Sequence, residues 1–192
     1  MSIVVDFARY ASDGTWTSAA VDGVTGSTSL YHSSGASDLV LTVVGSTLHV
    51  TGTIPAGPHR AGWVFAFDSC VTSWNNLGLS FETGGTLVGM NFTLAVQTDA
   101  DYPIDVGSGK GSCAFTSCAT KESECRFPSV PVPVPSDFLL YNGLSEFKGG
   151  SPEDSVSYGS AILGLKFDLQ CNQDIADCAV DFTLGMVKFY SA

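Results

Sequence analysis

The sequence predicts an all-β protein, an antiparallel β-sandwich of two sheets, and three observations support this prediction. Glycine, serine and threonine are abundant, whereas the lysine-, glutamate- and alanine-rich stretches typical of helices are missing. Short runs with strand character recur between turn signals along the chain. The 192 residues are 44% hydrophobic, which is enough for a sizeable core, and sandwiches of this length commonly form one domain. We therefore expect a single β-sandwich domain over residues 1–192.

Roughly ten segments are expected to form strands. They are Ile3–Phe7, Ser27–Tyr31, Asp38–Val44, Thr47–Ile54, Gly62–Phe67, Leu77–Thr83, Asn91–Thr98, Val130–Val134, Ala161–Phe167 and Ala179–Tyr190. Gly45 and Ser46 separate the third segment from the fourth and predict a tight hairpin turn. The seventh segment alternates and should bury Phe92, Leu94 and Val96 or their neighbours. The eighth has prolines at alternate positions, which lack an N–H, so it predicts an edge strand or a polyproline-like segment.

The tripeptide Val-Asp-Phe occurs near both ends of the chain, around Asp6 in the first expected strand and Asp181 in the last. A carboxylate between large apolar neighbours is costly to bury unless it is paired. Terminal strands lying side by side could bring both carboxylates to one cation, and calcium takes about 6–8 oxygen ligands. We therefore predict a structural calcium with Asp6 and Asp181 as metal ligands and Asp13 or Asp22 nearby. The alternative is that each aspartate caps a turn or faces solvent.

The stretch from Thr98 to Arg126 is irregular, polar and rich in cysteine. A loop of this length in a compact domain is usually functional or cross-linked. Asp99, Asp101 and Asp105 within it form a second oxygen-rich candidate for calcium. Their spacing is not that of an EF-hand loop, so we expect these aspartates to lie in a solvated loop.

The six cysteines are an even number in a chain with only three histidines, which favours disulfides over zinc. Cys171 and Cys178 enclose six residues and predict a bridge across a hairpin loop. The other four, Cys70, Cys113, Cys118 and Cys125, leave three connectivities, of which we favour Cys113–Cys118 with Cys70–Cys125. Disulfides require an oxidising compartment, so the protein is expected to be secreted or extracellular.

The formal net charge is −11, with only eight basic residues. Such a charge repels nucleic acid and anionic membrane surfaces, so neither is an expected partner. No apolar run approaches the length of about 18 residues that a transmembrane helix needs. The charge is compatible with calcium or with a neutral ligand.

Several phrases of the sequence resemble one known group of proteins. They are Val-Asp-Phe followed by Asp-Gly-Thr-Trp near the start, Phe-Asp-Ser-Cys before Leu-Gly-Leu-Ser-Phe, Gln-Thr-Asp-Ala-Asp-Tyr-Pro-Ile-Asp, and Ala-Ile-Leu-Gly-Leu-Lys-Phe before the closing Asp-Cys-Ala-Val-Asp-Phe-Thr-Leu. The pattern resembles the galactose-binding-like jelly-roll modules of secreted bacterial polysaccharide-degrading enzymes, close to carbohydrate-binding modules and CIA30-type domains. The resemblance implies a jelly-roll β-sandwich in which a calcium often ties the first strand to the last. Such modules often carry an Asp-Asp pair in the last strand, where this chain has Leu184-Gly185.

Sugar recognition needs flat apolar surfaces for the C–H face of a ring and hydrogen-bonding groups for its hydroxyls. Trp63 lies in an apolar segment and is expected in the core. The candidate ligand-binding residues are Trp74 and Tyr102 in polar surroundings, Trp16 after a turn, and the polar residues Asn75, Asp101 and Arg60. Trp16 could equally be a core residue.

Enzymatic signatures are weaker than these. The sequence has neither a His-Glu-x-x-His nor a Gly-x-Ser-x-Gly motif, and its histidines are dispersed. The main hypothesis is a non-catalytic module that binds a polysaccharide or oligosaccharide, as a monomer or as part of a larger secreted enzyme. The alternative is a polysaccharide lyase or glycoside hydrolase on the same fold, using His59 and Arg60 with a tyrosine or a carboxylate.

Overall fold

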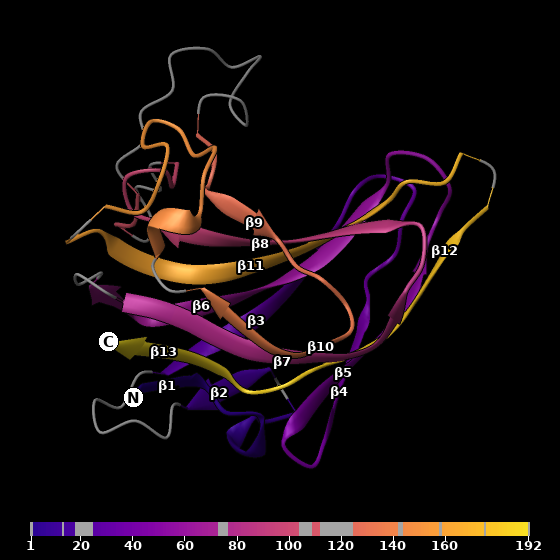
Figure 1. The fold of residues 1–192 in the computed structure, drawn as a ribbon, viewed down its shortest axis with the longest axis horizontal. Coiled ribbons are helices and arrows are strands. Elements are labelled where there is room, and N and C mark those ends of the chain that lie inside the picture. The colour runs from indigo at the N-terminus through magenta and orange to yellow at the C-terminus, as the bar shows by residue number, and fades with distance from the viewer. Residues whose placement is uncertain are drawn as a thin grey trace.

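The computed structural model describes residues 2–12, 14–17, 25–72, 77–103, 109–111, 125–141, 144–157, 159–174 and 176–191. Within these residues the chain forms two antiparallel β-sheets that pack against each other (Figure 1). The only helices among them are the single 3-10 turns η1 (Phe7–Arg9) and η2 (Leu144–Glu146). The predicted all-β jelly-roll sandwich is confirmed. Among the described residues, no helix has the length and apolar character that crossing a membrane demands.

One sheet has six strands. In spatial order they are β2 (Thr15–Thr17), β3 (Thr25–His32), β6 (Arg60–Thr72), β11 (Ala161–Cys171), β8 (Met90–Thr98) and β9 (Ser129–Pro131). The long strands β6 and β11 pair at the centre. The strand β9, which begins the segment with alternate prolines, lies at the edge, as predicted, because Pro131 has no N–H to complete a ladder on both sides.

The second sheet has seven strands. Its path runs through β1 (Ser2–Val5), β13 (Val187–Ser191), β7 (Leu77–Leu87), β12 (Cys178–Leu184), β5 (Thr47–Ile54) and β4 (Val40–Val44), while β10 (Ser136–Tyr141) also pairs with β7. The expected hairpin is confirmed as β4 and β5, and Gly45 in its turn has a φ of 64°, which favours glycine. The strands β2 and β10 were not among the segments expected from the sequence.

A β-bulge divides the last long strand into β12 and β13. Both segments lie along one edge of β7, with Leu184 opposite Thr83 and Lys188 opposite Ser80. The step from Leu184 to Lys188 is four residues long, whereas the step from Thr83 to Ser80 is three. The segment Gly185-Met186 therefore contains one extra residue. On its other edge β12 pairs with β5, whereas β13 pairs with β1. The sheet forks at this bulge, and the pairing of β1 with β13 brings the two chain ends near each other at the far end of β13 (Figure 1).

Aromatic side chains fill the space between the sheets. Trp63 of β6 stacks on Phe167 of β11, with ring centroids 4.9 Å apart and planes 5° from parallel. Phe182 of β12 contributes from the other sheet, 6.1 Å from Trp63 and 5.1 Å from Phe92. The prediction that Trp63 is a core residue is confirmed, as is the burial of the alternate β8 residue Leu94. These rings connect the two sheets through one continuous core.

One predicted disulfide is confirmed. Cys171 at the end of β11 is bonded to Cys178 at the start of β12, so the bridge links the two sheets. Cys125 is also disulfide-bonded, and its partner is therefore one of Cys70, Cys113 and Cys118. The side chains of these three cysteines lie outside the described part of the chain, so their pairing stays a prediction.

Replacing Trp63 with alanine should lower the free energy of unfolding by about 3–5 kcal/mol, because it leaves a cavity where a fully buried ring contacts Phe167 and Phe182. Val44→Ala is the matched control, since Val44 is 63% exposed and should change stability by less than about 0.5 kcal/mol. Urea unfolding followed by tryptophan fluorescence or circular dichroism measures both. Equal losses for the two variants would contradict this description of the core.

Candidate functional site

The outward surface of the six-stranded sheet carries a connected group of polar side chains. Alternation along β6 buries Ala61, Trp63 and Phe65, so Arg60 and Gly62 face away from the core. The register places Gly62 opposite Asp168 of β11, and Arg60 opposite Gln170. On neighbouring strands Tyr31 lies opposite Gly62 and Asn91 lies opposite Gln170. We call the surface formed by Tyr31, Arg60, Asn91, Lys166, Asp168 and Gln170 the polar face.

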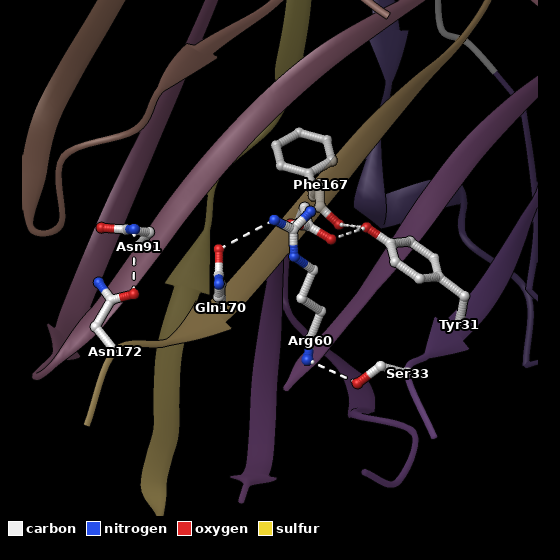
Figure 2. Close-up of polar contacts among 8 residues, drawn as sticks. Tyr31, Ser33, Arg60, Asn91, Phe167, Gln170 and Asn172 are labelled. Carbon is white, nitrogen blue, oxygen red and sulfur yellow. Dashed lines mark hydrogen bonds and ion pairs between the residues drawn. The ribbon is translucent and has the colours of Figure 1, made fainter. Parts of the chain in front are cut away.

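Tyr31 lies across the sheet instead of projecting from it (Figure 2). Its hydroxyl is 2.8 Å from Oδ1 of Asp168 and 2.9 Å from the carbonyl oxygen of Phe167, two strands away, and it donates its single proton to these acceptors. The ring passes over Gly62, where a Cβ would lie 2.5 Å from the hydroxyl oxygen. A side chain at position 62 would therefore displace Tyr31.

The environment keeps the Tyr31 hydroxyl protonated. Burial is the largest cause that raises its pKa far above the usual value, and the negative charge of Asp168 and the hydrogen bond to it raise the pKa further. Arg60 acts in the opposite direction but does not outweigh them. The Tyr31 hydroxyl is therefore a hydrogen-bond donor at neutral pH and is poorly suited to act as a general base.

Arg60 is held in place by three contacts and remains about half exposed. Its Nη2 donates to Oε1 of Gln170 at 3.2 Å, and its Nη1 lies 3.7 Å from Oδ2 of Asp168. Its backbone N–H donates to Oγ of Ser33 at 2.9 Å. The side chain is 54% exposed, so the remaining guanidinium donors point to solvent in a fixed plane.

Two further contacts extend the polar face. Nζ of Lys166 lies 4.5 Å from the centre of the Tyr31 ring, within cation–π range. At the other end, Nδ2 of Asn91 donates to Oδ1 of Asn172 at 3.2 Å (Figure 2). The surface thus combines an aromatic ring, a guanidinium, two amides, an ammonium and one carboxylate. Such a set can form several directional hydrogen bonds with a polyhydroxylated ligand.

The predicted ligand-binding residues fall in different places. Of these, Arg60 lies on the polar face. Trp16 is only 1% exposed and packs edge-on against Phe67 at 5.8 Å, so its ring cannot present a face to a sugar. The ligand-binding role expected for Trp16 is thus corrected to a core role. Trp74 and Asn75 lie outside the described residues.

The expectation of a solvated loop after β8 is wrong at Asp101. This carboxylate is fully buried, accepting hydrogen bonds from Oγ1 of Thr98 at 2.7 Å and from the backbone N–H of Glu153 at 2.9 Å. It fixes one loop to another and is not available to a surface ligand. Tyr102 beside it is partly buried, with its ring 5.7 Å from that of Phe127.

The structure does not bring Asp6 and Asp181 together. The terminal strands β1 and β13 do pair, but Asp181 belongs to β12, six residues before the Val187 that lies opposite Val5. At about 3.3 Å per residue, the two aspartates are roughly 15–20 Å apart. Asp6 caps η1, accepting from the backbone N–H of Ala8, and Asp181 is exposed with its Oδ1 2.8 Å from Nε2 of His49. No group of three or more His, Cys, Asp or Glu side chains converges among the described residues, and calcium binding stays a prediction.

Of the polar face, only Arg60 was predicted from the sequence. The available signal was the alternation from Leu165 to Gln170, in which Lys166, Asp168 and Gln170 occupy every second position. This pattern indicates one polar side of a strand, but it does not identify the residues on neighbouring strands. His59 precedes Arg60 in the sequence and was named with it for the alternative enzymatic function. Its imidazole lies against Gly35, in the loop after β3.

Comparison with known proteins supports the fold. No protein-family model matches the sequence, and no curated protein matches it either. Among solved structures, the chain is similar to the family 11 carbohydrate-binding module of the cellulosomal cellulase Lic26A-Cel5E of Clostridium thermocellum, with a TM-score of 0.55 and 15% identity over 86% of this chain and 88% of the module. It is also similar to the family 11 module from that organism in complex with a β-1,3-1,4-mixed-linked tetrasaccharide, with a TM-score of 0.55 and 16% identity over 86% and 89%. The chain therefore shares the jelly-roll fold of these modules.

The separate positions of the two aspartates lead to different expected effects. Asp6→Ala should lower the free energy of unfolding by about 1 kcal/mol, because it removes a buried cap. Asp181→Ala should cost less than about 1 kcal/mol, because its ion pair with His49 is exposed. Thermal melts with and without EDTA measure both. If chelation lowers the melting temperature of the parent and either variant abolishes that effect, a shared cation is present and this description is contradicted.

Tyr31 predicts an alkaline loss of stability. Because its pKa is raised in the folded state, the stabilisation is fully present below the unfolded pKa of about 10 and is lost as the pH rises above it. Tyr31→Phe removes this titrating group. The free energy of unfolding should then fall less steeply with pH, by about 1.4 kcal/mol per pH unit above pH 10. Burial raises the pKa of Tyr141 to about 12, so Tyr141→Phe should flatten only the window between pH 10 and 12. Identical slopes for parent and Tyr31→Phe in urea unfolding would refute the assignment.

Proposed function

We propose that the protein binds a polysaccharide or oligosaccharide on the polar face without transforming it. The observation that supports this most directly is the network in which Tyr31, Asp168, Arg60 and Gln170 hold one another in place while the guanidinium stays exposed. Side chains already fixed by their neighbours lose little freedom when a ligand binds. Neighbouring hydroxyls on a sugar match the paired donors and acceptors of guanidinium and amide groups.

The shared fold adds independent support. One of the similar modules was solved with a β-1,3-1,4-mixed-linked tetrasaccharide, and both are carbohydrate-binding modules. A polysaccharide chain needs an extended surface to lie on, and the polar face spans four adjacent strands, β3, β6, β11 and β8. We therefore propose a linear glucan or a related polysaccharide as the ligand class.

The chemistry of the polar face supports binding more than catalysis. Glycoside hydrolysis usually requires two carboxylates on either side of the bond, and the polar face contains one, Asp168, which is engaged by Tyr31 and Arg60. A lyase needs a base, and the raised pKa of Tyr31 opposes that role. We propose secretion as the setting of this function, because the bridge between Cys171 and Cys178 is typical of oxidising compartments.

Affinity electrophoresis and titration calorimetry with soluble glycans test the proposal. The panel contains mixed-linked β-glucan, xyloglucan, xylan, galactomannan and polygalacturonate. The parent protein should be retarded by at least one of these, and Arg60→Ala should weaken that binding by roughly tenfold or more, since a charged hydrogen-bonding group is lost. Arg126→Ala is the matched control, because Arg126 is exposed away from the polar face and should bind as the parent does.

Circular dichroism and melting temperature establish that each variant is folded. The proposal fails if no glycan of the panel retards the parent. It also fails if folded Arg60→Ala binds with the affinity of the parent, because the ligand would then lie elsewhere.

A further inference from the structure

A pocket lies on the outer side of the seven-stranded sheet, away from the polar face. It has a volume of about 150 Å³. The residues that line it include Ser46 and Thr47 from the β4–β5 hairpin, Ser80 and Glu82 from β7, and Met186 and Lys188 from the bulge and β13. These are the elements that meet where the sheet forks. The pocket is therefore a product of the β-bulge.

The bulge opens space that a regular ladder would fill. Before it, Leu184 has β5 as its second neighbour, and after it, Val187 has β1. At Gly185 and Met186, between these two pairings, the edge of β12–β13 that faces away from β7 has no strand partner among the described residues. Gly185 lies at this point, and a Cβ there would come within 3.1 Å of Cβ of Glu82. A side chain at position 185 would therefore press against Glu82 in the lining of the pocket.

The polar groups of the pocket are available to a ligand. Ser80 is only 4% exposed and forms part of the lining, while Glu82 is exposed at its edge. Within the described part of the chain, the side chains of Ser80, Glu82 and Lys188 form no hydrogen bond or ion pair. A carboxylate, an ammonium and a hydroxyl thus converge around one small space without satisfying one another.

The size and chemistry of the pocket define the kind of ligand. A cavity of about 150 Å³ is sufficient for one six-membered ring such as benzene. Glu82 would accept hydrogen bonds from hydroxyls, Lys188 and Ser80 would donate them, and the opposite charges of Glu82 and Lys188 cancel. A neutral ring bearing several hydroxyls meets these requirements. The apolar side chain of Met186 offers a surface for its C–H groups.

We propose that this pocket is a second saccharide subsite that takes one neutral pyranose residue, with Glu82 and Lys188 as its principal hydrogen-bonding groups. The proposal rests on the proposed function for the class of ligand, but the site is physically independent of the polar face. It would receive a chain end or a single-residue branch, because the pocket has room for one ring.

Chemical-shift titrations of the ¹⁵N-labelled protein test this subsite. The probes are the methyl β-glycosides of glucose, galactose and xylose, each added separately. At least one should shift the backbone amides of Gly185 and Met186, independently of any shift at Gly62 and Gln170. Glu82→Gln and Lys188→Met should each weaken that binding by roughly tenfold, as expected for loss of a charged hydrogen-bonding partner.

Matched controls separate the two sites. Glu146→Gln and Lys148→Met alter exposed residues outside the pocket and should leave the titration unchanged. Arg60→Ala should weaken polysaccharide retardation by roughly tenfold or more while leaving the shifts at Gly185 and Met186 intact. If none of the three glycosides shifts these two amides, or if folded Glu82→Gln and Lys188→Met bind as the parent does, the subsite is overturned. Failure of the polar face alone would instead appear as loss of polysaccharide binding with the pocket titration preserved.

Discussion

The pairing register between β6 and β11 is the constraint on which both the core and the polar face depend. In this register Trp63 lies opposite Phe167 and both point into the sandwich, while Gly62 lies opposite Asp168 and both point outward. A shift of one residue would turn the stacked rings toward solvent and bury the charged groups, reversing every side chain of the strand. The apolar stack at 4.9 Å therefore holds the ladder in the register that also assembles the ligand-facing network.

Within that register, Gly62 allows the polar face to be assembled across strands. Tyr31 can reach Asp168 on β11 only because the intervening strand has no side chain at the point where the ring passes. Asp168 then has two partners, the Tyr31 hydroxyl and Arg60, and Gln170 orients the same guanidinium. The four side chains limit one another's rotamers, so the surface is ordered before any ligand arrives. Such order favours a rigid, repetitive ligand over a flexible one.

Features that depend on a few consecutive residues could be predicted from the sequence, whereas features that depend on residues far apart in the chain could not. The alternation of β8 and the hairpin around Gly45 are contained in a few consecutive residues, so both could be predicted. The burial of Trp16 could not, because it depends on Gly26 across the ladder, where the indole occupies the space that a side chain would take. The polar face joins residues from Tyr31 to Gln170 through a register that no local pattern specifies.

The repeated Val-Asp-Phe illustrates the same limit in a different way. Its two copies suggested equivalent positions on neighbouring terminal strands, but the bulge at Gly185-Met186 changes the neighbour of the last strand from β5 to β1. Asp181 therefore stays with β5 while Asp6 begins η1 beside β13. The pairing register separates the carboxylates expected to share a cation, and the extra residue at the bulge opens the sheet where Glu82 and Lys188 line a pocket. The disulfide from Cys171 to Cys178 joins the strand that carries Asp168 to the strand that leads into this bulge, so a covalent bridge between the sheets connects the strands that carry the two outer surfaces.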